Sequence, residues 1–212
     1  MNTKISFKKY LLICALGFGL GGALWGLILY TELPNLQYPF HFMAIIIMGL
    51  FGGISLAWPL ASVKEHSKSV LAGFLGWGIG FVAGGVLSYP LYFIGIYFLS
   101  IIPFINNSIG DKFFELINLT QNNISIGNFW LIFLFIGAII GLFYSLFLKT
   151  KKWAVIWRAG AGLALGSIIG PIIGNLIGNL FNSLLISYLI TFILIGVISG
   201  LSLSWGIYKY RI

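Results

Sequence analysis

The chain has 212 residues, of which 59% are hydrophobic and only 8% are charged. Soluble domains carry about 25% charged residues, so this composition excludes an ordinary water-soluble fold, and the high hydrophobicity excludes a disordered chain. The charges are clustered and leave five charge-free blocks, which span residues 10–31, 33–63, 69–110, 116–148 and 159–208. Each block exceeds the roughly 20 residues that cross a bilayer as a helix, so we expect an all-α polytopic membrane protein.

These blocks divide into six expected transmembrane helices that form one membrane domain over residues 1–212. In chain order the helices cover residues 10–30, 41–62, 69–102, 128–148, 153–180 and 184–208. The third helix is too long for a hydrocarbon core of about 30 Å, and it contains Pro90, which we expect to kink it. The first follows Lys4, Lys8 and Lys9, as a secretory signal would, but its apolar run is too long and no cleavage motif follows, so we interpret it as uncleaved.

The basic residues predict the orientation. Six helices place 11 of the 12 Lys and Arg residues on one side of the membrane, and only Lys112 falls on the other. By the positive-inside rule that side is cytoplasmic, so we expect both termini in the cytoplasm and the plasma membrane as the location. Counting residues 69–102 as two helices would move Lys149, Lys151 and Lys152 outside, which favours six helices over seven. The net charge of +8 is then an orientation signal, and we expect no nucleic-acid partner.

Paired glycines recur along the chain and predict an internal repeat. The odd-numbered helices share glycines four residues apart, at Gly17 and Gly21, Gly76 and Gly80, and Gly162 and Gly166. The even-numbered helices share an apolar residue followed by a Gly-x-x-x-Gly pair, beginning at Met48, Ile136 and Ile195. We therefore predict three helical hairpins in the same orientation, related by a pseudo-threefold axis along the membrane normal.

The glycines have a physical reason to be present, because helices in lipid associate through close backbone contact rather than through hydrophobic burial. The expected helix-packing positions are Gly17, Gly21, Gly76, Gly80, Gly84, Gly162, Gly166, Gly170, Gly174 and Gly178. Because these stripes are richest in the odd-numbered helices, we expect those helices to be the inner ones. The alternative is that the glycines line a narrow pore.

Polar features are few. Asn175, Asn179 and Asn182 share one face of the fifth helix, where they either hydrogen-bond to another helix or contact a solute. Glu32 and His41 near the outer surface either bind a cation together or anchor the interface. In the outer loop, residues 103–127, the spacing after Ser108 predicts a short amphipathic helix on the interface, or a lid over the bundle.

No charged residue lies deep within a predicted span, and no catalytic or metal-binding motif is present, so we expect neither an enzyme nor a bound cofactor or metal. The single Cys14 is interpreted as a packing residue. The sequence favours a glycine-packed structural or assembly component of a membrane complex, with the lipid bilayer and either protein partners or further copies of the chain as its partners. The alternative is a channel or facilitative transporter for a small solute, with a path lined by Asn175 and Asn179.

Overall fold

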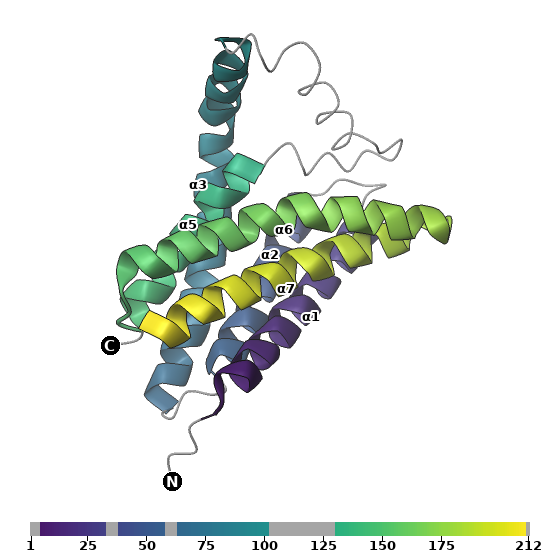
Figure 1. Ribbon diagram of the computed structural model, residues 1–212. Helices are drawn as coiled ribbons and strands as arrows, with labels where there is room; N and C mark the ends of the chain where they lie inside the picture. The colour runs from purple at the N-terminus through teal and green to yellow at the C-terminus, as the bar shows by residue number, and fades with distance from the viewer. Residues whose placement is uncertain (1–4, 33–37, 58–62, 102–129, 211–212) are drawn as a thin grey trace.

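The computed structural model describes residues 5–32, 38–57, 63–101 and 130–210, and this part of the chain is all-helical (Figure 1). Six helices are present in it: α1 (Phe7–Glu32), α2 (Tyr38–Ala57), α3 (Val63–Ile101), α5 (Trp130–Phe147), α6 (Lys152–Leu180) and α7 (Leu184–Tyr210). The predicted outer loop, residues 103–127, lies outside the described residues, as do the side chains of Glu32 and His41.

Three of these helices are long and apolar enough to cross a membrane: Phe7–Thr31, Trp153–Leu180 and Leu184–Tyr210. Two shorter apolar segments, Ile45–Ala57 and Ile132–Phe147, lie within α2 and α5. The molecule is therefore a helical protein with at least three segments compatible with membrane insertion.

The third helix extends beyond the segment predicted for it. Helix α3 has 39 residues, or about 58 Å at roughly 1.5 Å per residue, and its far end projects past its neighbours in Figure 1. The helix continues through Pro90 and does not end there.

The six helices close into a ring. Each of them packs chiefly against two others, in the cyclic order α1, α2, α3, α5, α6, α7 and back to α1. Chain neighbours are therefore spatial neighbours, and the contact of α7 with α1 closes the ring. The first, third and fifth predicted helices correspond to α1, α3 and α6. The expectation that they are the inner helices is wrong for the described residues, because every helix occupies an equivalent place with two main neighbours.

The glycines lie where neighbouring helices meet. A methyl group added to Gly21 would come within 2.8 Å of the Cα atom of Met48, and one added to Gly166 within 3.0 Å of the Cα atom of Ile195. The glycine stripe of α6 runs along one partner, α7, and its members are Gly162, Gly166, Gly170, Gly174 and Gly178. A stripe of this kind lets the backbones of two helices approach closely. It therefore indicates an interface with one neighbour and does not show that the helix is surrounded on all sides.

Helix α1 uses two glycine faces for its two neighbours. A methyl group on Gly21 would meet α2, whereas one on Gly26 would lie 2.8 Å from the carbonyl oxygen of Tyr188 in α7. The opposite surface of α1 carries exposed leucines, as expected for a face in contact with acyl chains: Leu12, Leu16, Leu20, Leu24 and Leu27. Small residues thus face the neighbouring helices and large aliphatic residues face outward.

Large side chains fill the inside of the ring. The rings of Trp25 and Phe81 make an edge-to-face contact at 5.4 Å, although they belong to α1 and α3, which are separated by α2 in the ring. Phe18 reaches Trp77 of α3 at 6.2 Å in the same way. Phe133 of α5 lies 6.2 Å from Phe81. Aromatic side chains from different helices therefore converge at the centre.

The close helix contacts predict a selective effect of small substitutions. Because a methyl group on Gly170 would lie 2.6 Å from the carbonyl oxygen of Thr191, Gly170→Ala forces α6 and α7 apart, and we expect it to lower the free energy of unfolding by about 1–3 kcal/mol. The measurement is unfolding of the detergent-solubilised protein by SDS, followed by circular dichroism.

Gly19→Ala is the matched control. A methyl group at this position would meet only a methyl group of Val197, at 3.0 Å, and a side chain can move aside more easily than a backbone carbonyl. We expect a change below about 0.5 kcal/mol. Equal destabilisation by both substitutions would show that the α6–α7 contact has no special sensitivity to size.

Candidate functional site

The amide face predicted on α6 is divided between two environments. Asn175 is buried, and its Oδ1 atom accepts a hydrogen bond of 2.6 Å from the hydroxyl group of Ser187 in α7. Asn179 and Asn182 are exposed, and Asn182 follows the end of α6 with a φ of 48°, in the left-handed region. The structure therefore places one amide between two helices and does not gather the three around a common cavity.

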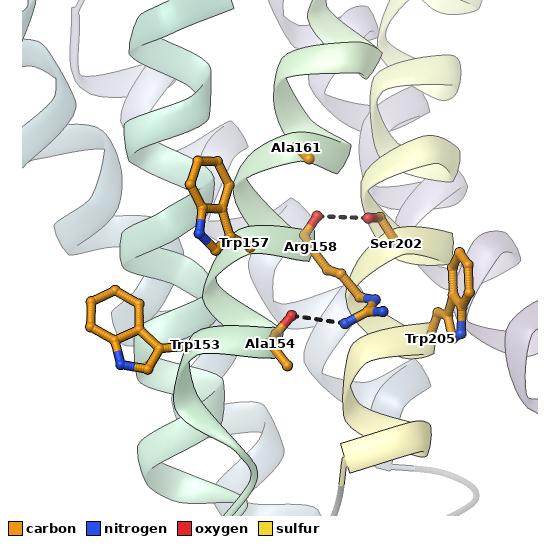
Figure 2. A pocket seen from close by; sticks show the side chains of 7 residues that line it. All are labelled: Trp153, Ala154, Trp157, Arg158, Ala161, Ser202 and Trp205. Carbon is orange, nitrogen blue, oxygen red and sulfur yellow. Dashed lines mark hydrogen bonds between the residues drawn. The ribbon is translucent and has the colours of Figure 1, made fainter.

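A pocket that the sequence did not reveal lies on the outer side of α6 and α7. It has a volume of about 530 Å³, and Figure 2 shows the residues that line it: Trp153, Ala154, Trp157, Arg158, Ala161, Ser202 and Trp205. The depression is shallow and open to the outside. The tryptophans stand on both sides of the pocket, with Trp153 and Trp157 on α6 and Trp205 on α7.

The helical repeat of α6 explains how this pocket forms. Trp153, Trp157 and Ala161 are four residues apart, so they stack along one face of the helix, and the small side chain of Ala161 leaves a hollow beyond the two indoles. The indoles of Trp153 and Trp157 are 76% and 63% exposed, so packing between the six helices does not require side chains of this size.

A glycine and a serine hold the two walls of the pocket together. Gly162 has no side chain, and the Cβ atom of Ser202 packs against it. From this position the hydroxyl group of Ser202 donates a hydrogen bond of 2.6 Å to the carbonyl oxygen of Arg158 (Figure 2). The close approach of α6 and α7 thus fixes the backbone from which the Arg158 side chain extends.

Arg158 supplies the charge of the pocket. Its guanidinium group lies over the rings of Trp205 and Tyr210, at 5.1 and 4.7 Å from their centroids. Nη1 donates to the carbonyl oxygen of Ala154 at 3.3 Å, and Nη2 donates to the hydroxyl group of Tyr210 at 3.5 Å. These contacts hold the side chain half-buried between the helices.

The charge on Arg158 has no carboxylate on either wall to neutralise it. Neither α6 nor α7 contains Asp or Glu. Further positive charge is close, because the backbone N–H of Lys151 donates to the carbonyl oxygen of Tyr210 at 3.1 Å, next to Lys209. The pocket is therefore an electropositive, aromatic hollow.

The sequence contained the parts of this pocket but gave them other roles. Trp153, Trp157 and Trp205 are typical of an aromatic belt at a membrane interface, and Arg158 contributes to the charge asymmetry that predicts orientation. The sequence signal that could have indicated the α6 wall of the pocket is the four-residue spacing of its two tryptophans next to an arginine. The other wall, formed by α7, depends on how the two helices pack.

Comparison with known proteins finds no protein-family model, no curated protein and no solved structure that matches the chain.

The Asn175–Ser187 hydrogen bond predicts an energetic coupling between α6 and α7. Side-chain hydrogen bonds between helices in membranes contribute about 0.6 kcal/mol on average and up to about 1.7. We expect Asn175→Ala and Ser187→Ala to be coupled by an amount in this range in a double-mutant cycle of unfolding. Asn179→Ala is the control, because Asn179 is exposed. A coupling of zero would contradict a stabilising role for the bond.

Proposed function

We propose that the protein is a six-span membrane protein, built from three repeated hairpins, that acts as a structural or assembly component of a membrane complex. The observation that carries the proposal is the filled centre of the ring, where Phe18, Trp25, Trp77 and Phe81 are in contact. A scaffold needs a stable, closed bundle and an outer surface for partners, whereas a conduit needs a path through the bundle.

The proposed topology has all six helices crossing the plasma membrane, with both termini in the cytoplasm. It is supported by the charges, because the described basic side chains gather at one end of the ring: Lys8, Lys9, Lys68, Lys149, Lys151, Arg158 and Lys209. We name this the basic end. The stacking of Phe7 against Tyr208 at 5.0 Å places the start of α1 beside the end of α7 there. The positive-inside rule makes the basic end cytoplasmic.

The proposed repeat is supported by equivalent contacts within the hairpins. In each proposed hairpin the first helix is α1, α3 or α6. The second repeat glycine of this helix faces the residue that precedes the first repeat glycine of the second helix. The pairs are Gly21 with Met48, Gly80 with Ile136, and Gly166 with Ile195. The first repeat glycine of the same helix faces a residue that lies seven positions after this partner in the second helix. These pairs are Gly17 with Ser55, Gly76 with Phe143, and Gly162 with Ser202. Three hairpins that fold alike would give this pattern.

The contacts between hairpins follow the same pattern, with one offset. Gly53 faces Ser69 and Gly141 faces Val155, and these partners lie seven residues before the repeat glycines Gly76 and Gly162. Gly200, the equivalent glycine of α7, faces Cys14, which lies only three residues before Gly17. In the proposed repeat the α7–α1 interface is therefore shifted by four residues, about one helical turn or 6 Å.

The filled centre favours a scaffold over a channel because an open path needs polar surface or space along the axis of the bundle. Met48 of α2, Trp77 of α3 and Ile140 of α5 are almost completely buried. The buried Asn175 forms its hydrogen bond with the adjacent helix α7. The channel or transporter therefore remains the second candidate, and its central requirement is access of water to these positions.

Co-migration tests the proposed role. A protein of 23.3 kDa that belongs to a complex should migrate on native gels of mildly solubilised source membranes at a mass well above that of one chain in detergent. The same tagged chain produced in an unrelated host is the control, because further copies of the chain would still assemble there but partners would be missing. A single chain in both hosts, with solute flux after reconstitution, would contradict the scaffold role.

Cysteine accessibility tests the closed centre. In a Cys14→Ser background we expect Met48→Cys and Asn175→Cys to resist a charged, membrane-impermeant thiol reagent in proteoliposomes, because both native side chains are buried. Asn179→Cys, one turn from Asn175 and exposed, should react with it. Reaction at both Met48→Cys and Asn175→Cys would demonstrate a water-filled path and favour the transporter.

A further inference from the structure

The pocket between α6 and α7 lies on the outer face of the helix ring. Both helices are long and apolar enough to span a membrane. Beyond Ala161, the same face of α6 continues with exposed aliphatic side chains: Leu165, Ile169, Ile173 and Leu176. An acyl chain that lies along this stripe would bring its glycerol and head group to the basic end of the helix, where the tryptophans stand.

The chemistry of the pocket selects a negatively charged group. Tryptophan rings alone could surround a cationic head group, such as the quaternary ammonium of choline. Arg158 prevents this, because its charge already occupies the faces of Trp205 and Tyr210 and would repel a second cation. A guanidinium group has five N–H donors, of which Arg158 uses two on Ala154 and Tyr210, so donors remain for an anion.

The other two hairpins lack the Trp157–Arg158 pair, although Trp58 occupies the position equivalent to Trp205. If the proposed repeat is correct, the positions equivalent to Trp157 are Leu12 and Leu71, both exposed and apolar. The positions equivalent to Arg158 are Ile13 and Ala72. The ring can therefore be built with aliphatic residues at these two positions, and helix packing does not require an indole at Trp157, which is 63% exposed.

We propose that this pocket binds the phosphate group of an anionic phospholipid. Arg158 donates to the phosphate oxygens, Trp153, Trp157 and Trp205 enclose the glycerol region, and one acyl chain follows the aliphatic stripe of α6. Ser202 contributes by positioning, because its hydroxyl group is engaged with the Arg158 carbonyl oxygen. The site needs only α6 and α7 to lie in a membrane, so it does not depend on the scaffold role.

Native mass spectrometry of the full chain in detergent tests the site. Palmitoyl-oleoyl-phosphatidylglycerol and the corresponding phosphatidylcholine are titrated separately, and the dissociation constant of the first bound lipid is measured. We expect the phosphatidylglycerol to bind at least about fivefold more tightly, and Arg158→Gln to remove this preference. Lys9→Gln removes the same charge from an exposed position at the basic end and should leave the preference unchanged.

A second variant keeps the test decisive if Arg158→Gln does not fold. Ala161→Leu keeps the charge and fills the hollow beside the indoles, so we expect it to weaken the first phosphatidylglycerol at least about fivefold. Circular dichroism and gel filtration check the fold of each variant. Equal affinity for both lipids in the native chain, or an unchanged preference in Arg158→Gln, would overturn the proposal.

Competition with inorganic phosphate separates a lipid site from a site for a free anion. We expect phosphate at millimolar concentration to leave the bound phosphatidylglycerol in place, because the ion lacks the acyl chain that covers the stripe. Full displacement would assign the pocket to a free phosphate ion. Displacement by a soluble acidic peptide alone would assign it to a protein partner. Either result would overturn the lipid site.

Discussion

Close contact between helix backbones at glycine is the interaction on which the rest of this structure depends. Apolar side chains gain little from contact with one another in lipid, so helices need backbone proximity and shape complementarity to associate. The approach of Gly170 to the Thr191 carbonyl oxygen and of Gly21 to Met48 shows how little space separates neighbouring helices. Without these contacts neither the closed ring nor the pocket between α6 and α7 would have a defined geometry.

The same constraint separates the roles of small and large side chains. Glycines occupy the interfaces, aromatic rings such as Trp77 fill the centre, and leucines such as Leu16 cover the outside. Each class is placed by what surrounds it: a neighbouring backbone, the interior of the ring, or the outer surface. The pocket departs from this arrangement because Trp153 and Trp157 expose large indoles on the outer surface, where helix packing does not require them.

The proposed repeat, with a modified third hairpin, also agrees with the shifted α7–α1 interface. Identical interfaces would give an even ring, whereas a shift of one turn at a single interface makes one side of the ring different from the other two. Gly200 reaches Cys14 in place of a residue one turn earlier, which changes the relative height of the first and third hairpins. The modified hairpin is one of the two that meet at this interface.

Local properties of the sequence determined the class of protein, the six helical segments and the positions of the glycines, because hydropathy and glycine spacing depend only on nearby residues. The predicted bounds of residues 153–180 and 184–208 agree closely with α6 and α7. What the sequence could not determine is which helix each glycine faces: Gly21 and Gly26 lie on one helix but contact α2 and α7. The ring order, the aromatic centre, and the pairing of Trp157 with Trp205 across a pocket were decided only by the tertiary structure, because they require contacts between segments far apart in the chain.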